Sequence, residues 1–363
     1  MKLPEANEIE LSVFGPGYGE SIVIHIGSGK WAIIDSCLDD NHEPASISYL
    51  TALGIPVEEA VISVSASHWH DDHVKGLAKT LEACPKARLS VGAALRREEF
   101  LAFLQVHEDQ PVKILDRGGS ELLNCLKLAA ETPRQVKVLQ EDTIVLDCDA
   151  DELAHNRRVE LRALSPSSKQ FTDFLRRIAD FPNKSEGSPK HRISEPSRND
   201  LSVAMLLSVG QQGVLLGADL EERGDRLKGW RAVVEARRGR HPLSHSFKVP
   251  HHGSRNAHNE DVWNEMLEGK PTSIVTPMNK GRHRLPNDTD LERLRTLSSR
   301  CYLTSTPRTV PLKKKYGAEI AKLINASEVK FDASAYSGGR VTIRWTPDAR
   351  APNVQLFGGA IKV

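Results

Sequence analysis

The stretch AVISVSASHWHDDH (residues 60–73) carries the pattern that decides the fold, because an apolar run turns directly into a cluster of histidines and aspartates. The apolar run suits a buried strand, and the cluster then lies on the loop that leaves this strand. The candidate ligands on the loop are His68, His70, Asp72 and His73. Imidazole and carboxylate groups are the ligands that a borderline-soft cation such as zinc takes. A solvated polar loop without a metal is the alternative, but the HxHxDH spacing rarely arises by chance.

The spacing within this loop predicts two neighbouring cation sites. His68 and His70 can project to one side of the loop, whereas Asp72 and His73 can turn toward a second point a few ångströms away. Such a separation is typical of two-metal hydrolases. We therefore expect a dinuclear centre at the end of this strand, with Asp72 among its catalytic groups.

Two later strands also end in residues that can bind a metal. The apolar run Gly213–Leu216 is followed by Gly-Ala-Asp, which places Asp219 where a carboxylate could bridge two cations. Asp219 could instead cap a helix, since a helical stretch is expected directly after it. The stretch FKVPHHGS (residues 247–254) is again a strand that ends in histidines, His251 and His252. A lone pair of histidines is weak evidence, but three such strand ends together predict one metal centre.

The order of strands and helices predicts a layered fold. Short β-rich runs separated by glycine turns open the chain, and strands followed by helices recur in both halves. This alternation predicts an α/β or α+β layered architecture. The expected strands are Ile9–Phe14, Ser21–Ile26, Trp31–Ile34, Ala60–Val64, Arg88–Val91, Val159–Leu164, 201–209, 212–217, Ser246–Val249, 272–276 and 301–304, and the expected helices are 76–83, 93–104, 221–236, 259–268 and 288–298.

Two stretches fall outside this alternation. Residues 182–200 are rich in Pro, Ser and charged residues, which predicts a mobile loop rather than a domain linker. The tail from about residue 311 is expected to end in a hairpin of Val341–Trp345 with Val354–Phe357. We therefore divide the chain into a main domain, 1–310, and a C-terminal extension, 311–363, that packs on it as a helix and a hairpin.

The composition argues against several classes of protein. The 363 residues are enough to bury a core without a disulfide or a metal. With 49 basic and 48 acidic residues the net charge is +1, so a chain-wide coat of nucleic acid is not expected. No apolar stretch is long enough to span a membrane, and the N-terminus has no apolar secretion signal. The five cysteines form no CxxC pair and are expected to be reduced and buried, as in a cytoplasmic protein that has no membrane partner.

The three motifs together resemble those of the metallo-β-lactamase superfamily. The sequences VPHHGS (249–254) and GVLLGADLE (213–221) are most similar to those of the hydrolase domain of ComEC/Rec2 DNA-uptake proteins and of its stand-alone soluble relatives. The further segments that match are FGPGYGES (14–21), WAIID (31–35) and NDLS (199–202). The resemblance covers about residues 9–305. It implies a four-layer αββα sandwich with a dinuclear, usually zinc, centre in a cleft at the strand ends.

The resemblance also implies how the ligands are shared between the two metals. His68 and His70 would hold the first metal. Asp72 and His73 would hold the second, and Asp219 would bridge the two. Zinc is the expected metal, with manganese as the alternative.

Further roles follow from the same resemblance. Either His251 or His252 would complete the second metal, and we favour His252. His251 would then face the substrate, where it could touch a phosphate oxygen or donate a proton. Asp35 would orient a ligand histidine through its ring N–H. The candidate substrate contacts are Asn199, Ser254 and Lys248.

One position departs from the family pattern. Many members supply a third histidine to the first metal, at the place where this chain has Ser165. The first metal is then expected to be weaker, completed by water, or exchangeable with manganese. His107, His155 and His191 are substitutes for the missing ligand or, alternatively, ordinary surface histidines.

These features favour a hydrolase. A water between two cations becomes hydroxide near neutral pH and attacks an ester carbon or phosphorus. No GxSxG motif is present to supply a serine nucleophile. The favoured substrate is a phosphodiester in nucleic acid or a nucleotide, which makes the protein a phosphodiesterase or nuclease. The alternatives are a hydrolase of another ester, lactone or lactam, and a metal-binding, non-catalytic module of a multiprotein complex, for example one of a defence system, with an unidentified protein partner.

Three basic runs could hold the phosphates of such a substrate. They are Arg237-Arg238-Gly239-Arg240, Arg282-His283-Arg284 and Lys313-Lys314-Lys315. A solvated face is the alternative for each run, because charge runs usually just face water. Aromatic residues make up only 5% of the chain, so a stacking platform for single strands is not evident.

Overall fold

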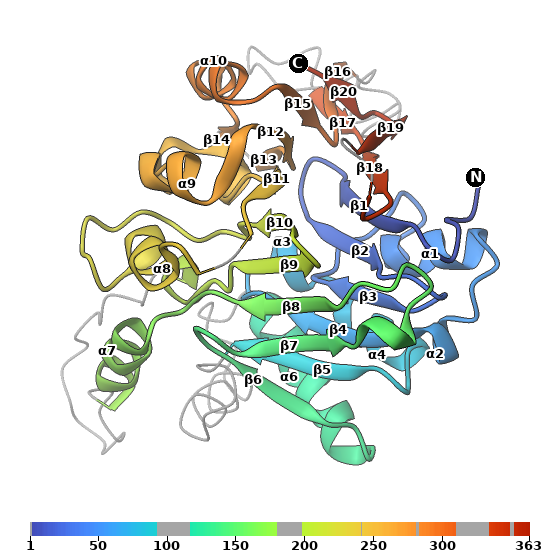
Figure 1. Ribbon diagram of the computed structural model, residues 1–363. Coiled ribbons are helices and arrows are strands. Elements are labelled where there is room, and N and C mark those ends of the chain that lie inside the picture. Colours follow the sequence, from blue (N-terminus) through green and yellow to red (C-terminus); the bar gives the residue numbers. More distant parts are fainter. Residues whose placement is uncertain are drawn as a thin grey trace, which may run out of the picture.

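Two eight-stranded sheets lie face to face in the computed structural model, which describes residues 2–92, 117–179, 198–240, 242–280, 283–309, 334–348 and 352–363 (Figure 1). The strands at the start of the chain are buried along their whole length. Their apolar side chains point alternately to two faces, and each face needs a covering layer. The two sheets and the helices outside them supply those layers.

The first sheet is mixed. Its spatial order is β19 (Asn353–Gly358), β18 (Gly339–Trp345), β1 (Ile9–Gly15), β2 (Ser21–His25), β3 (Trp31–Ile34), β4 (Val61–Ala66), β5 (Arg88–Gly92) and β6 (Val136–Leu139). The pairs from β19 to β3 are antiparallel, whereas those from β3 to β6 are parallel. The parallel half places the carboxyl ends of β3, β4 and β5 along one edge.

The second sheet has the same mixed character. Its order is β20 (Ile361–Lys362), β15 (Arg300–Leu303), β12 (Leu267–Val275), β11 (Ser244–Lys248), β10 (Gln212–Leu216), β9 (Met205–Val209), β8 (Val159–Ala163) and β7 (Ile144–Cys148). The strands β10, β11, β12 and β15 are parallel to one another. Two small ribbons are added, β13 (Met278–Lys280) with β14 (His283–Leu285) and β16 (Thr306–Thr309) with β17 (Ser334–Ser337).

Helices cover the outer faces of both sheets (Figure 1). The α-helices are α1 (Ala45–Ala52), α2 (Val57–Ala60), α3 (Asp71–Val74), α4 (Leu77–Ala83), α6 (Arg117–Glu131), α7 (Ser168–Ala179), α8 (Gly229–Arg237), α9 (Glu260–Glu265) and α10 (Asp288–Leu297). The 3₁₀ turns are η2 (Ala150–Glu152), η3 (Arg198–Leu201), η4 (His251–Gly253) and η5 (Arg255–Ala257). None of the helices in the described ranges is both long and apolar enough to cross a membrane.

Three separate apolar cores show that these elements form four layers. The core around Trp31 and Leu50 lies between the first sheet and helices α1, α4 and α6. The core around Leu11 and Leu207 lies between the two sheets. The core around Trp230 lies between the second sheet and helices α8, α9 and α10. The predicted αββα layering is therefore confirmed.

The prediction of a helix over 221–236 is wrong for the first half of that range. Helix α8 begins only at Gly229, and the residues before it form a loop. Gly224 and Gly229 have φ angles of +68° and +59°, which a right-handed helix does not accommodate. Asp219 therefore does not cap a helix, and that alternative reading of Asp219 is wrong.

Other expected elements differ in extent. The helix expected over 259–268 ends at Glu265, because β12 starts at Leu267. Helix α6 and strands β6 and β7 lie in a stretch where no element was expected. The helix expected over 93–104 lies outside the described residues. So does most of the loop expected over 182–200, although its last three residues begin η3 rather than continue a mobile loop.

The C-terminal hairpin is confirmed, with Val341 of β18 opposite Leu356 of β19. Strand β18 also pairs with β1 over seven residues, and β20 pairs with β15 at the edge of the second sheet. The tail is thus woven into both sheets rather than placed on their surface. The helix expected in the tail and the run Lys313–Lys315 lie outside the described residues, and the boundary at residue 310 stays a prediction.

Candidate metal centre

The histidine loop leaves β4 at the carboxyl edge of the first sheet. The loop passes into the short helix α3, and the side chains of His68 and His73 are buried. Asp72 is also buried, whereas His70 is half-buried at the rim. The rings of His68 and His73 lie 4.2 Å apart and those of His68 and His70 4.8 Å apart, measured between centroids. The loop thus turns its imidazole groups toward a common space.

The second sheet brings Asp219 and His252 to the same space. Asp219 follows β10 after a backbone turn at Ala218, which has a φ of +43°. Its Oδ1 atom lies 3.3 Å from Nε2 of His73, and its Oδ2 atom lies 3.8 Å from Nε2 of His68. His252, in turn η4 after β11, has its Nε2 atom 3.2 Å from Oδ2 of Asp72 and 3.6 Å from Oδ2 of Asp219.

Three groups of potential metal ligands occur among the described residues, and two of them share Asp219. Of these two, one contains Asp72, His73, Asp219 and His252, and the other contains His68, His70 and Asp219. The third group, Glu20, Asp35 and His73, lies behind His73. Within each group the ligand atoms lie within 4.8 Å of one another. The structure therefore brings together the residues that the sequence assigns to two cation sites, in the division that the sequence predicts.

The buried polar atoms at this place fit two cations. The Nε2 atoms of His68, His73 and His252 and the Oδ1 atom of Asp219 are buried and have no hydrogen-bond partner. An unpaired buried polar atom is unfavourable by about 1–3 kcal/mol, so four of them in one place call for a ligand. Imidazole nitrogen and carboxylate oxygen are donors that zinc accepts.

Each of these histidines is oriented through its other ring nitrogen. His73 Nδ1 donates to Asp35 Oδ2 at 2.8 Å, and His252 Nδ1 donates to the Thr276 carbonyl at 2.9 Å. His68 Nδ1 lies 3.0 Å from Ser67 Oγ. A proton on Nδ1 leaves the lone pair of Nε2 free for a metal.

Asp35 reaches both candidate sites. Its Oδ2 accepts from His73 Nδ1 and, at 2.6 Å, from the Ser67 hydroxyl, while its Oδ1 accepts from the Ser67 backbone N–H at 2.7 Å. Because the Ser67 hydroxyl donates to Asp35, it must accept from His68 Nδ1–H. The single carboxylate thus orients one histidine directly and the other through Ser67, a contact that the sequence analysis did not find.

The ionisation states agree with metal binding. Burial alone would raise the pKa of Asp219, but the neighbouring His252 and His73 hold that pKa well below its ordinary value. Burial is likewise outweighed at Asp72, where His252 and His73 lower the pKa of the carboxyl. Burial, followed by the nearby His73, lowers the pKa of His68 well below its ordinary value. The two carboxylates are therefore ionised and His68 is neutral, as metal ligands need to be.

His73 behaves differently because it faces two carboxylates. Burial alone would lower its pKa, but Asp219 and Asp35 raise that pKa well above the ordinary value of a histidine. Without a metal, a proton on Nε2 therefore faces Oδ1 of Asp219 at 3.3 Å, while the proton on Nδ1 is bonded to Asp35. A metal ion has to displace this proton, so binding at this position releases a proton.

Ser165 does not replace the third histidine of the first group. Its hydroxyl donates to the Ser202 carbonyl at 2.7 Å and accepts from the Ala204 backbone N–H at 2.8 Å. The described His155 has its Nε2 atom 3.0 Å from the Ile26 carbonyl, at the far end of β2. His107 and His191 lie outside the described residues. Within the described residues the first group therefore has three protein ligands, and the expectation of a weaker first metal stays a prediction.

The predicted substrate contacts fall into different environments. Lys248 is completely buried and pairs with Glu20, so its ammonium group cannot reach a substrate and that prediction is wrong. Ser254 donates its backbone N–H to the His251 carbonyl and closes the turn. Asn199 and His251 contact each other, with Asn199 Nδ2 3.2 Å from His251 Nε2. His251 is not on an extended strand, because it and His252 have φ angles of +46° and +55° in turn η4.

A cavity of about 170 Å³ opens beside Asp72. Its walls come from the loop after β1, the loop after β3 and helix α3. The lining residues are Pro16, Tyr18, Gly19, Cys37, Leu38, Asp39, Asp40, His42, Asp71, Asp72 and Lys75. This cavity is the space next to the candidate metal centre in which one side of a substrate could lie. Its aspartates outnumber its single lysine, so it is not built to attract polyanions.

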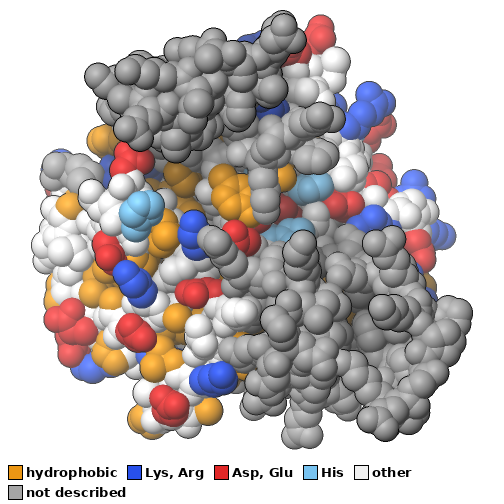
Figure 2. Space-filling view, turned by 180° about the vertical axis from the view of Figure 1, so that it is seen from behind, with side chains coloured by type: hydrophobic (Ala, Val, Ile, Leu, Met, Phe, Trp, Pro, Cys, Tyr) orange, Lys and Arg blue, Asp and Glu red, His pale blue; other side chains and the backbone are white. Residues whose placement is uncertain are grey.

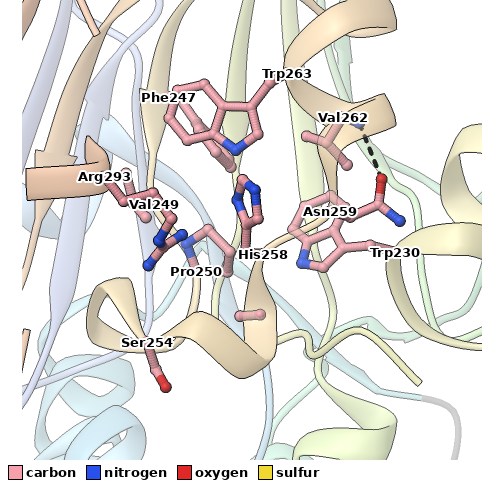
Figure 3. Close-up of a pocket in the computed structure, with 11 residues that line it drawn as sticks. Trp230, Phe247, Val249, Pro250, Ser254, His258, Asn259, Val262, Trp263 and Arg293 are labelled. Carbon is pink, nitrogen blue, oxygen red and sulfur yellow. Dashed lines mark hydrogen bonds between the residues drawn. The ribbon is translucent and has the colours of Figure 1, made fainter. Parts of the chain in front are cut away.

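A second cavity, of only about 10 Å³, lies behind turn η4 (Figure 3). Trp230, Phe247 and Trp263 surround it, and the ring of His258 lies among them. The side chain of Ser254 points away from these rings (Figure 3). This space holds about one water molecule and forms part of the packing beneath the turn.

Two arginines of the first basic run form ion pairs within the protein. Arg237 is buried and pairs with Asp142, and Arg238 pairs with Glu265 at 2.6 Å. Arg282 lies outside the described residues. On the face shown in Figure 2, the Lys and Arg side chains of the described residues are scattered among Asp and Glu. Arg237 and Arg238 therefore have a structural or solvated role rather than a phosphate-binding one.

Comparison with known proteins gives a structural likeness only. No family model matches the chain, and no curated protein sequence matches it. A metallo-β-lactamase mutant from Cronobacter sakazakii is 15% identical, with a TM-score of 0.32, over 59% of this chain and 63% of that one, which is less than two thirds of its length. The metallo-β-lactamase SMB-1 is 13% identical, with a TM-score of 0.34, over 73% and 82%. A putative metallo-β-lactamase from Thermotoga maritima is 14% identical, with a TM-score of 0.32, over 58% and 79%.

The class of the protein rests on its own layers and side chains. It is a four-layer α/β sandwich whose two sheets meet, at their carboxyl ends, in a buried histidine and aspartate cluster able to hold metal ions.

Proposed function

We propose that the protein is a metal-dependent hydrolase of the metallo-β-lactamase type. One observation carries this proposal: three buried Nε2 atoms and one carboxylate oxygen lie without partners in two ligand groups that share Asp219. The division of ligands is the one that the resemblance in sequence implies. The likeness to ComEC-type hydrolase domains is part of the proposal, and its only support is the amino-acid sequence of the motifs.

Each residue of the cluster has a stated task in this proposal. His68 and His70 hold the first metal, Asp72, His73 and His252 hold the second, and Asp219 contacts both. Two divalent cations, zinc in our proposal, supply an activated water and neutralise the charge of the transition state. Asp35 and Ser67 keep the ring nitrogens aimed at the metals. Burial of the cluster strengthens its electrostatic interactions.

Within this class we favour a phosphodiesterase acting on nucleic acid or a nucleotide. The resemblance to a DNA-associated family supports this choice, and the cavity beside Asp72 gives room for one small group next to the scissile bond. A second candidate is hydrolysis of another ester, a lactone or a lactam. The acidic lining of that cavity favours this candidate over a long polyanion, since Asp39, Asp40 and Asp71 would repel a phosphate chain.

The test has two readouts. Protein reconstituted with zinc is analysed for its metal content and is then assayed with bis(p-nitrophenyl) phosphate and with p-nitrophenyl acetate. We expect close to two metals per chain and turnover of the phosphodiester. Turnover of the acetate alone would favour the second candidate. Two bound metals without any turnover would favour a non-catalytic, metal-binding module, and a chain that binds no metal would refute the proposal.

A further inference from the structure

His251 lies beside the candidate metal centre, but both of its ring nitrogens are taken by amide side chains. Its Nδ1 atom lies 2.8 Å from Oδ1 of Asn256, and its Nε2 atom lies 3.2 Å from Nδ2 of Asn199. Its backbone N–H donates to the Ala218 carbonyl at 2.9 Å, next to Asp219. The ring side chain is 16% exposed, and its Nδ1 atom also lies 3.6 Å from Oε1 of Glu221, a distance beyond hydrogen bonding that further favours a proton on Nδ1. His251 is therefore held in place and has no free N–H for a substrate.

The orientation of the Asn199 amide decides where the proton of His251 sits. Asn199 Nδ2 lies 2.8 Å from Oε1 of Glu221, and Glu221 forms an ion pair with Arg223 at 3.1 Å. A carboxylate paired with arginine is ionised and can only accept hydrogen bonds, so the NH₂ group of Asn199 has to face it. The second hydrogen of that NH₂ group then points at His251 Nε2. This nitrogen must be the unprotonated one, and the proton is on Nδ1, bound to Asn256 Oδ1.

We propose that Glu221 is a positioning residue that fixes the amide of Asn199 and, through it, the Nδ1–H tautomer of His251. The Nδ1–H of His251 is bonded to Asn256 and its Nε2 to Asn199, so neither ring nitrogen offers a proton to a substrate. Oδ1 of Asn199 is buried, so the amide acts by holding His251 rather than by contacting a substrate. Only the consequence for turnover rests on the proposed hydrolase function.

The tautomer can be read directly by nuclear magnetic resonance. Zinc-reconstituted protein labelled with ¹⁵N-histidine gives two-bond ¹H–¹⁵N correlations that distinguish a protonated from an unprotonated ring nitrogen, and the spectrum of His251→Gln identifies the His251 signals. We expect a protonated Nδ1 and an unprotonated Nε2 in the native chain. A protonated Nε2 would overturn the proposal.

A pair of substitutions that reverses the donors and acceptors makes the test sharper. In the double variant Asn199→Asp/Glu221→Gln, the amide donates to the carboxylate, and the carboxylate can accept only from a protonated Nε2 of His251. We expect the tautomer to invert while the total charge stays the same. An unchanged His251 spectrum in this variant would show that Glu221 and Asn199 do not set the tautomer.

The single variant Glu221→Gln tests the consequence for turnover. Its side chain no longer forces the NH₂ group of Asn199 toward it, so the His251 signals should shift. Turnover of bis(p-nitrophenyl) phosphate should fall by about 10- to 100-fold at unchanged metal content, as is common when an orienting residue is lost. The matched control is Glu222→Gln, because Glu222 binds Asn259 rather than Asn199. Unchanged signals in Glu221→Gln would contradict the proposal even if the chain hydrolyses no ester.

Discussion

At the scale of single residues, the centre is defined by which nitrogen of each histidine is already bonded. His68, His73 and His252 all use Nδ1 for a hydrogen bond to protein, which leaves Nε2 directed at the shared space. The partners differ: a hydroxyl, a carboxylate and a backbone carbonyl. Because three unrelated contacts turn the three imidazole rings the same way, with Nε2 toward the shared space, the fold itself sets this orientation.

Asp219 is the residue on which both ligand groups depend. We expect Asp219→Ala to lose most of both metals and all hydrolysis of bis(p-nitrophenyl) phosphate, while circular dichroism shows a retained fold. The matched control is Asp225→Ala, since Asp225 caps an exposed turn in the same loop through a bond to the Leu227 N–H. Normal metal content in Asp219→Ala would place the metals elsewhere.

His252 and its neighbour His251 should behave differently. His252→Ala removes a ligand atom and should lower the metal content by about one ion per chain. His251→Ala should leave the metal content nearly unchanged and slow turnover, because the native His251 helps to hold Asn199. Elemental analysis of both variants decides this. If His251→Ala is the variant that loses metal, the two roles are exchanged.

Ser67 links Asp35 to the first ligand group only. Ser67→Ala should therefore weaken binding of one metal by about 10- to 100-fold and leave the other nearly unchanged. Asp35→Asn should weaken both, since Asp35 also bonds His73. Competition with a chelator measures the two affinities. Equal weakening of both metals in Ser67→Ala would show that the Ser67 contact does not orient His68.

The ligands themselves were predictable from sequence, but their supports were not. The spacing in HxHxDH and the strand before it are local features, and they place His68 and His73 correctly. Ser67 and Glu221 act through side chains that are 32 and 22 residues away along the chain. Contacts of this kind depend on how loops from separate strands meet, which no local pattern records. Lys248 was predicted wrongly for the same reason, because its partner Glu20 lies in the loop between β1 and β2 of the other sheet.

At the scale of elements, the turn that carries His252 is held in an unfavourable backbone form. His251, His252 and Gly253 all have positive φ angles, of +46°, +55° and +83°. Such angles are unfavourable by about 1–2 kcal/mol for residues other than glycine. Arg293 of helix α10 stabilises the turn by donating to the Gly253 carbonyl at 2.6 Å.

A side chain at Gly253 would be crowded by its neighbours. A Cβ atom there would lie 3.1 Å from Leu294 Cδ1 and 3.3 Å from Pro286 Cβ. We expect Gly253→Ala to lower the free energy of unfolding by about 2–3 kcal/mol and to reduce binding of the second metal. The matched control is Gly269→Ala, where φ is +54° but nothing lies within 4 Å. Gly269→Ala should lower the free energy of unfolding by only about 1 kcal/mol. If urea unfolding shows equal losses of stability in the two variants, the contacts at Gly253 are unimportant.

Strands were easier to predict than helices for a physical reason. Buried strands such as β3 and β4 are short apolar runs bounded by glycine or serine, so their pattern is complete within a few residues. Helix α6 begins with Arg117-Gly118-Gly119, and two adjacent glycines, which are poor helix formers, obscure the helical pattern at its start. The apolar spacing over 221–236 is helical, yet Gly224 and Gly229, with positive φ angles, delay the start of α8 to Gly229.

At the scale of the whole molecule, buried neutral histidines make stability depend on pH. Burial lowers the pKa of His25 from 6.5 to about 4, and the ring bonds the Glu8 carbonyl at 2.9 Å. Between these values the unfolded chain takes up a proton that the folded chain refuses, so stability falls as pH falls from 6.5 to 4 and then levels off. The loss is about 3 kcal/mol. In His25→Gln, urea unfolding should show a decline smaller by about this amount, and parallel curves would contradict the assignment.

The pairing of β1 with β18 has a consequence for how the chain is made. Ser12 and Thr342 are hydrogen-bonded partners separated by 330 positions. A ribosome that adds about 5–20 residues per second needs roughly 20 seconds to one minute to cover that distance. During this interval β1 has β2 on one side and an open edge on the other. The pairing of β1 therefore waits until β18 has been synthesised, and until then the nascent chain exposes an apolar edge strand that chaperones can recognise.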